Sequence, residues 1–435
     1  VAGASYRRVR FPDHAILMTE GLQPEPCKQC ARILERGMSI LLMISSTVPE
    51  GGLCRPAGAG GEGRKTLGCA TRSAAAATTI GFGHFRCDTI GPVITVILCT
   101  YAALLGAEPT GQIAFVSGTE QEDRRVEIIE LATGAVAPLG PGDRDGAPVW
   151  SPDGQWLAFP TKGPDGMVIR IVRADGSEAR NVPHKYAWND IPRWSPDGSL
   201  VAYTGTNGAD DIRPEDMAKG SFIMVYNVAG NTEEQWGGDA MSLYCPVWMD
   251  AGTIIAIGVL PGQKRLTTHI FFVNPGDANP LPPEAMPSAG EYIEWAPDAN
   301  IKRNLLAYDS NDGGDREVFV LSYKRGSTDV SNHRAADWNP VWQPGGEWLA
   351  FESFRSGRRG VYRVFPSTIR VFPVAVGENY DNWHPAWSPD GAFLAYVSDR
   401  LGTPQIFVTE IESGQTREAT TGGRFALSPA WRPAP

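Results

Sequence analysis

A short motif that recurs along most of the chain is the feature that most limits its fold. Its full form is Pro-x-Trp-Ser-Pro-Asp-Gly followed by a hydrophobic stretch ending in Ala-Phe or Ala-Tyr, at residues 147–159, 191–203 and 384–396, with weaker copies at 245–257, 293–308 and 339–351. The motif tryptophans are Trp150, Trp194, Trp248, Trp295, Trp342, Trp387 and Trp431, and neighbouring ones are 44 to 54 residues apart. Repeats of this length are typical of the four-stranded blades of a β-propeller. An open β-sandwich does not account for such a repeat.

Each copy of the motif predicts a tight β-hairpin. Pro-x-Trp opens a short strand, Ser-Pro-Asp-Gly forms the turn, and the Ala-containing stretch returns as the second strand. In the turn, proline sets φ, glycine takes the left-handed position, and the aspartate bonds to nearby backbone. Asp153, Asp197 and Asp390 are therefore interpreted as structural turn residues. An apolar third strand and a polar fourth strand follow, and the polar strand suits an outer edge.

The two ends of the repeat region complement each other. Residues 112–116 read as a second strand with no first strand before it, and residues 428–433 read as a first strand with no partner after it. Joining them completes a blade shared by residues 112–140 and 428–433. The seven motif tryptophans then match seven second-strand alanines: Ala114, Ala158, Ala202, Ala256, Ala307, Ala350 and Ala395. We therefore predict that residues 109–435 form a seven-bladed β-propeller closed by its own ends.

The segment before the propeller has a different character. Residues 89–107 contain no charged residue. We expect residues 86–108 to form a signal peptide, with an uncleaved membrane anchor as the alternative. Residues 1–85 show no sustained period and are expected to be a poorly structured extension from a misassigned start. This leader predicts a periplasmic or extracellular protein, and a membrane contact only through residues 89–107.

Composition limits the partners and cofactors. The net charge is −10 and lies in the propeller region, which excludes sequence-independent binding to nucleic acid. Cys27 and Cys30 have the spacing of half a zinc knuckle, but no second pair follows, so we expect incidental cysteines and no cofactor. Two acidic loops, within Gly205–Ser221 and Asp309–Asp315, are loose calcium candidates without the spacing of a calcium loop. We expect a monomer.

The repeat resembles the WD40-like unit of TolB-type propellers and of the propeller domains of prolyl-oligopeptidase-like serine peptidases. The resemblance covers residues 111–435 and implies a propeller fold with a binding role in the cell envelope. Two features depart from these families. TolB has six blades and an N-terminal α/β domain, whereas residues 1–105 show no alternation of strands and helices. No Gly-x-Ser-x-Gly motif is present, so the resemblance does not extend to a peptidase nucleophile.

Candidate site residues cluster just before the first strands, where loops meet at the channel mouth. They are the acids Asp145, Asp190, Glu291, Asp337 and Asp381, the tryptophans Trp188, Trp338 and Trp383, and the histidines His184, His333 and His384. One interpretation is a polar, aromatic-lined funnel that holds a peptide or a sugar. The alternative interpretation is that the acids cap turns, the tryptophans seal blades and the histidines pack singly.

Three functions follow from this pattern. The first is a non-catalytic module that binds a protein, peptide or glycan at the channel face. The second is a metal-dependent carbohydrate-active lyase or hydrolase, which requires the three histidines to converge. The third is a structural repeat in a larger assembly. Arg355–Arg359, a small basic group on an acidic protein, is a candidate partner contact or ordinary surface.

Overall fold

The computed structural model of the chain describes residues 6–11, 14–19, 108–140, 142–207, 220–239, 241–259, 268–278, 280, 297–311, 314–322 and 326–434. The chain divides into two units, Val1–Leu104 and Leu105–Pro435. In the first unit β1 (Tyr6–Phe11) pairs antiparallel with β2 (His14–Thr19). The paired cysteine motif and the predicted leader up to residue 107 lie outside the described residues. Among the described residues, no helix has the length and apolar character needed to cross a membrane.

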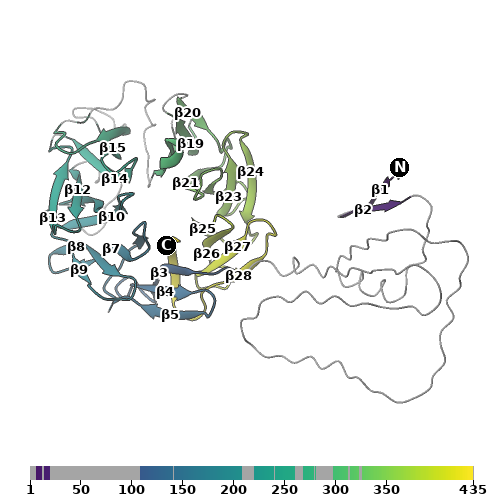
Figure 1. Cartoon of the computed structure of the whole chain (residues 1–435), viewed down its shortest axis with the longest axis horizontal. Helices are drawn as coiled ribbons and strands as arrows, with labels where there is room; N and C mark the ends of the chain where they lie inside the picture. The colour runs from purple at the N-terminus through teal and green to yellow at the C-terminus, as the bar shows by residue number, and fades with distance from the viewer. Residues whose placement is uncertain are drawn as a thin grey trace, which may run out of the picture. The chain divides into compact units, whose positions relative to one another are not determined.

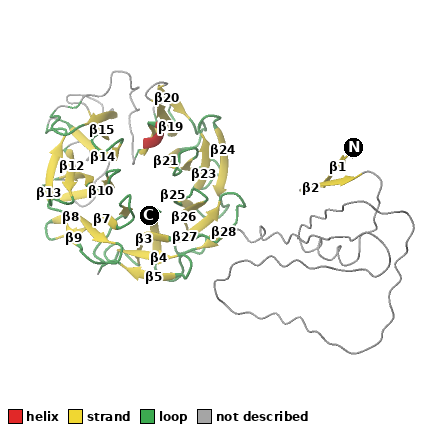
Figure 2. Cartoon of the chain, viewed as in Figure 1, coloured by secondary structure: helices red, strands yellow, loops and turns green. Residues whose placement is uncertain are grey.

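The second unit is an all-β propeller, as the repeat predicts. Its sheets are arranged around a common centre (Figure 1). The helical segment seen in the described part of the unit is the short 3-10 turn η2, Ile301–Arg303 (Figure 2).

Neighbouring strands run antiparallel and follow one another along the chain, except where β10 meets β8 and where β29 pairs with β3. Four of the described sheets have four strands, and three of these are built from consecutive strands. The first contains β17 (Asp298–Asn300), β18 (Leu305–Ser310), β19 (Glu317–Ser322) and β20 (Gly326–Asp329). The second contains β21 (Asp337–Trp342), β22 (Leu349–Ser353), β23 (Gly360–Phe365) and β24 (Arg370–Ala375), and the third contains β25 (Asn382–Trp387), β26 (Phe393–Ser398), β27 (Gln405–Glu410) and β28 (Thr416–Glu418). A three-stranded sheet contains β14 (Ser242–Trp248), β15 (Ile254–Val259) and β16 (Thr268–Val273).

Two further sheets include the first part of the unit. One contains β6 (Val149–Trp150), β7 (Trp156–Gly163), β8 (Gly166–Arg173), β9 (Arg180–Asn181), β10 (Trp188–Trp194), β11 (Leu200–Thr206), β12 (Ser221–Asn227) and β13 (Thr232–Trp236). Its two halves are joined by a single parallel pair, Trp188 with Met167. The other contains β29 (Phe425–Trp431), β3 (Gln112–Gly118), β4 (Arg125–Glu130) and β5 (Ala135–Pro138), in that order. Here the last strand of the chain pairs with β3 through Trp431 and Ile113.

The Ser-Pro-Asp-Gly turns are held by their aspartates. Asp197 accepts a hydrogen bond from Ser195 Oγ at 2.6 Å and one from the backbone N–H of Ser199 at 3.1 Å. These bonds hold the pKa of Asp197 below its usual value. Asp153 and Asp390 make the same pair of contacts in their own turns. The three aspartates therefore stabilise three separate hairpins.

The motif tryptophans join neighbouring sheets. Within the eight-stranded sheet, Trp194 Nε1 donates to the carbonyl oxygen of Val149 at 3.2 Å. The corresponding bond to the preceding sheet is made at 3.0 or 3.1 Å by Trp150, Trp248, Trp342, Trp387 and Trp431. The bond from Trp150 reaches Ala430, so it links the two ends of the unit. A hydrogen bond of this kind contributes about 1 kcal/mol. The same side chain therefore links the first strand of each of these repeats to the first strand of the preceding repeat.

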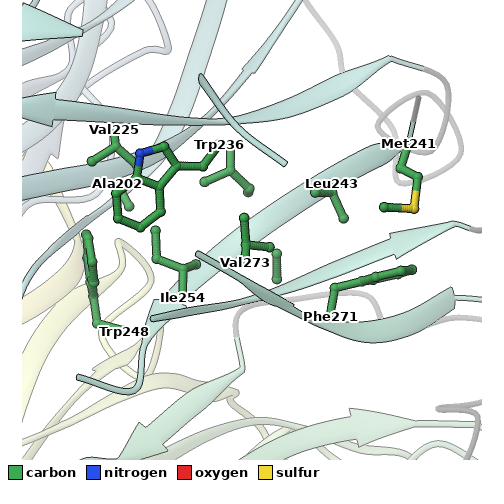
Figure 3. Packing of buried hydrophobic residues seen from close by; sticks show 11 residues of the cluster. Ala202, Val225, Trp236, Met241, Leu243, Trp248, Ile254, Phe271 and Val273 are labelled. Carbon is green, nitrogen blue, oxygen red and sulfur yellow. The ribbon is translucent and has the colours of Figure 1, made fainter. Parts of the chain in front are cut away.

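The cores lie between adjacent sheets. Trp236 and Trp248 meet edge to face with ring centroids 5.8 Å apart, and both lie next to Ile254 (Figure 3). All seven second-strand alanines have 0% exposure. Only a small side chain fits where two sheets approach this closely, which explains why alanine recurs there.

The strand register corrects one motif assignment. Asp298 pairs with Ala307, and Ala299 pairs with Leu306, as the residue before the tryptophan and the tryptophan itself do in the other units. Trp342 Nε1 also donates to the carbonyl oxygen of Asp298 at 3.1 Å. Ala299 therefore stands at the position that the sequence analysis gave to Trp295, which lies outside the described residues. An insertion in this weaker copy of the motif, at residues 293–308, moved the first strand relative to the tryptophan.

Candidate functional site

A cavity of about 880 Å³ opens where the first strands of several sheets begin. Its wall combines residues from the starts of β10, β21, β25 and β29 with the loop before β6, so strands far apart in the sequence contribute to one space. The residues that line it are Gln121, Arg124, Arg144, Gly146, Ala147, Pro148, Pro160, Met167, Trp188, Asp190, Ile191, Pro192, Arg193, Arg316, Trp338, Asn339, Arg359, His384, Pro385, Ser428 and Pro429. We call it the channel cavity.

A strained backbone position recurs around this wall. Ile191, Asn339, His384 and Ser428 each precede the motif proline, and each has a left-handed φ, between 51° and 57°. The strand register shifts at the same point in all four strands, which marks a β-bulge. Such a conformation costs about 1–3 kcal/mol per non-glycine residue, and a following proline disfavours it further. The bulge places a residue that differs from unit to unit at the cavity wall.

Five arginines line the channel cavity, although the chain as a whole has a net charge of −10. They are Arg124, Arg144, Arg193, Arg316 and Arg359, and Asp190 is the single acid among the lining residues. Three of them, Arg124, Arg316 and Arg359, immediately precede the third strand of their sheets. These three arginines occupy equivalent positions in different sheets, and all three line the same cavity.

A fully buried carboxylate organises one side of the cavity. Glu352, with 0% exposure, forms an ion pair with Arg359 Nε. Its other oxygen accepts hydrogen bonds from Asn339 Nδ2 at 2.7 Å and from the backbone N–H of His384 at 2.9 Å. Glu352 therefore holds three cavity-lining residues from two sheets in one arrangement.

Tryptophan faces in this region are covered by guanidinium groups. The centroid of Trp338 lies 5.8 Å from the guanidinium carbon of Arg316 and 5.4 Å from that of Arg359. Arg359 also lies 5.6 Å from the ring of Trp383, and Arg316 Nε donates to the buried Asp309 at 2.6 Å. These cation–π contacts fix the arginine side chains against the wall. Asp309, a loose calcium candidate in the sequence, is thus engaged by an arginine.

Four of the predicted site residues line the channel cavity: Trp188, Asp190, Trp338 and His384. Burial raises the pKa of Asp190, opposed by the backbone N–H of Ile191 at 2.6 Å and by the charge of Arg193. Burial lowers the pKa of His384, which favours its neutral form at neutral pH. A neutral imidazole next to arginines adds no further positive charge.

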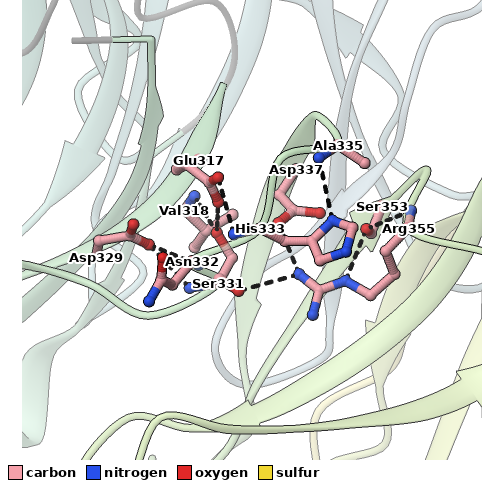
Figure 4. A network of polar contacts seen from close by, with 10 residues as sticks. All are labelled: Glu317, Val318, Asp329, Ser331, Asn332, His333, Ala335, Asp337, Ser353 and Arg355. Atoms are coloured by element: carbon pink, nitrogen blue, oxygen red, sulfur yellow. Dashed lines mark hydrogen bonds and ion pairs between the residues drawn. The ribbon is translucent and has the colours of Figure 1, made fainter. Parts of the chain in front are cut away.

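Asp145 and Asp337 are buried within their sheets and do not line the cavity. Asp145 accepts hydrogen bonds from Thr161 Oγ1 at 2.6 Å and from the backbone N–H of Val126 at 3.1 Å, and burial raises its pKa. Asp337 pairs with Arg355 Nη2 at 2.7 Å (Figure 4). Both stand five residues before a motif tryptophan, whereas Asp190 stands four before. Because side chains alternate along a strand, one residue of offset moves a carboxylate from the cavity into the sheet.

Asp381 and Trp383 also lie off the cavity wall. Asp381 accepts a hydrogen bond from the backbone N–H of Arg359 at 3.2 Å, and Arg358 lies 3.6 Å from it. The basic group Arg355–Arg359 therefore contacts acids of its own sheets. Glu291 lies outside the described residues.

The three predicted histidines do not converge. His384 lines the cavity, whereas His184 is exposed elsewhere and His333 packs in a separate network. There the backbone N–H of His333 donates to Glu317 at 2.9 Å, and its Nδ1 accepts from the N–H of Ala335 at 3.0 Å (Figure 4). Within the part of the chain that the structure describes, no three His, Cys, Asp or Glu side chains group as a metal site requires. The geometry needed for the metal-dependent hypothesis is not found here.

Comparisons with known proteins agree on the fold. No family model matches the chain. It is 27% identical over 193 residues to an uncharacterised peptidase YuxL of Bacillus subtilis, covering 42% of this chain and 27% of that protein. It is 25% identical over 151 residues to an uncharacterised protein of Agrobacterium fabrum, covering 34% of this chain and 51% of that protein. The chain thus spans about half or less of the length of these relatives.

Among solved structures, the propeller domain of the Trilobed protease from Pyrococcus furiosus matches with a TM-score of 0.54 and 12% identity, covering 72% of this chain and 96% of that domain. TolB from Acinetobacter baumannii matches with a TM-score of 0.51 and 14% identity, covering 79% and 76%. Both likenesses concern the fold alone. The chain has the β-propeller fold shared by TolB and the propeller domains of prolyl-oligopeptidase-type peptidases.

Proposed function

We propose that this chain is a seven-bladed, exported β-propeller whose channel cavity binds a protein or peptide partner without catalysing a reaction. The observation that carries the proposal is the cavity itself, because side chains from at least four sheets converge on it. A volume of about 880 Å³ falls in the range of ligand sites, about 300–1,000 Å³. The repeated strain before the motif prolines supports a functional wall, since strained residues gather at binding sites.

The seven-bladed count rests on the seven fully buried alanines and on the pairing of β29 with β3. The eight-stranded sheet then counts as two blades, joined where β10 meets β8. Export rests on the uncharged segment at residues 89–107. Amino-terminal sequencing of the protein from its native cell tests this part. A mature chain that begins near Glu108 supports cleavage and export, and one that retains residues 1–107 contradicts cleavage.

The binding site is tested by panning a random peptide library against the full chain. We expect enriched peptides to bind the wild type and to lose binding when Ala147→Trp fills the cavity. Ala147 is exposed and lines the cavity, so the larger side chain extends into open space. Val136→Trp on the outer strand β5, where Val136 is 47% exposed, is the matched control. Peptides that bind all three proteins equally would place the site elsewhere and refute the proposal.

A further inference from the structure

We propose that the ligand of the channel cavity is an acidic peptide segment, whose carboxylates are bound by the cavity arginines. This inference rests on the proposed channel-face binding and names the chemistry that the site recognises. Arginine is suited to this role because its planar guanidinium binds a carboxylate through two parallel hydrogen bonds.

Two of the arginines have no carboxylate within salt-bridge distance among the described residues, namely Arg124 and Arg193. The Nε of Arg124 is buried and has no hydrogen-bond partner in the described part of the chain. Its guanidinium carbon lies 6.0 Å from the ring of Phe425, which gives it an aromatic support but no acceptor. A buried donor left unsatisfied costs about 1–3 kcal/mol. A carboxylate in the cavity would balance the charge of this guanidinium, to which the described residues offer no carboxylate within salt-bridge distance.

Among the residues that the structure describes, Arg193 donates one hydrogen bond, from Nη1 to the carbonyl oxygen of Pro192 at 3.1 Å. Asp190 and Asp298 act on it only through longer-range attraction. Its counterparts in most other first strands are aliphatic, such as Val149 and Val341, and one is the acidic Asp298. An arginine in place of valine at a cavity wall adds a charge that the repeat does not need for its own packing.

Arg359 is held ready for a ligand. Its Nε is engaged by the buried Glu352, and its guanidinium lies against Trp338 and Trp383. With Nε occupied inside the wall, a ligand in the cavity is left with the terminal Nη groups. Such preorganisation lowers the entropy lost on binding.

The covered tryptophans favour a peptide over an acidic glycan. A sugar ring binds by stacking on an open aromatic face, but Trp338 has two guanidinium groups over it and Phe354 at 5.2 Å. The remaining wall is rich in proline, an apolar surface without N–H donors. The prolines are Pro148, Pro160, Pro192, Pro385 and Pro429. Proline rings between guanidinium groups suit a peptide ligand in which carboxylates alternate with hydrocarbon segments.

The test uses the full chain and a fluorescent tetraglutamate peptide, acetylated at its N-terminus and amidated at its C-terminus, read by fluorescence anisotropy. Tetraglutamine and a tetramer of uronic acid serve as competitors. We expect tetraglutamate to bind at least about tenfold tighter than tetraglutamine, and more weakly as salt is raised. The double variant Arg124→Gln/Arg193→Gln is expected to lose about tenfold or more in affinity. Arg193→Lys, which keeps the charge, should retain most of it.

Arg370→Gln, on the outer strand β24, is the control and is expected to bind as the wild type does. If Ala147→Trp abolishes tetraglutamate binding but the double arginine variant does not, channel binding stands and the role of the arginines is refuted. If the uronic acid tetramer binds more tightly than the peptide, the peptide assignment is overturned in favour of an acidic glycan. If Ala147→Trp leaves tetraglutamate binding unchanged, the channel site itself is refuted.

Discussion

Replacing Glu352 by glutamine removes the charge that organises the arginine side of the channel cavity. The carboxylate has 0% exposure and accepts from Arg359 Nε, Asn339 Nδ2 and the backbone N–H of His384. Glutamine has nearly the same shape, but one of its two polar atoms is an NH₂ group. That group cannot accept a hydrogen bond, so at least one donor loses its partner and the charge of Arg359 is left without compensation.

The expected loss in the free energy of unfolding is about 2–4 kcal/mol. Breaking a fully buried ion pair costs about 3–5 kcal/mol, but the side chain of Arg359 is 28% exposed, so water compensates part of its charge. Urea unfolding followed by tryptophan fluorescence measures the change as a lower midpoint at an unchanged slope. The matched control is Glu347→Gln, because Glu347 pairs with Arg303 at 3.2 Å with both side chains exposed.

An exposed pair of this kind contributes about 0–1 kcal/mol, so Glu347→Gln should change the midpoint little. A loss of less than about 1 kcal/mol in Glu352→Gln, or an equal loss in both variants, would refute the reasoning. It would mean that the cavity wall does not depend on this carboxylate. The same variant should also weaken tetraglutamate binding, because Arg359 would no longer be held at the wall.

Three further predictions concern the fold. Burial raises the pKa of Glu317 from 4.5 to about 7, so its contribution to stability is present at pH below 4.5 and is lost as the pH rises through 7. Glu317→Gln should therefore reduce the decline of the urea unfolding midpoint between these pH values. A decline as steep as that of the wild type contradicts the assignment. Deleting residues 425–435 removes β29 and leaves β3 as an exposed edge strand, so light scattering should report aggregation. A monomer with a normal unfolding transition would argue against ring closure by these strands. Ala350→Leu overpacks a fully buried site and should cost about 1–3 kcal/mol by urea unfolding, while Ala135→Leu on the exposed strand β5 should cost little; equal effects would speak against close contact between sheets at Ala350.

Much of the fold could be predicted because the residues that determine each hairpin lie within a single repeat. Turn residues, strand alternation and the motif tryptophan are neighbours in sequence, so their roles appear in a single copy and are reinforced in the next. The prediction failed at Trp295, where an insertion moved the strand and Ala299 took the tryptophan position. Only the hydrogen-bond register, which depends on the neighbouring strand, shows this.

The candidate site was predicted less well. Trp188, Asp190, Trp338 and His384 line the cavity, but Asp145 and Asp337 turn into their sheets and His184 and His333 lie elsewhere. Of the cavity arginines, the sequence analysis singled out only Arg359, within the candidate partner contact Arg355–Arg359. The others were missed, because they lie at positions that the motif does not specify. The residue before each motif proline changes from copy to copy while its neighbours repeat, and this variation could have indicated a position at the cavity wall.

The sequence by itself determined the repeating hairpin, the all-β class and the buried alanine of each second strand, because these depend on contacts within one repeat or between adjacent repeats. Only the tertiary structure decided which side chains share the central cavity. Convergence there depends on the curvature of the ring of sheets, which brings Arg124 and Arg359 from different sheets to the same wall. The bulges in β10, β21, β25 and β29 add the residues before the motif prolines to that wall. The charge of that wall therefore differs in sign from the charge of the chain.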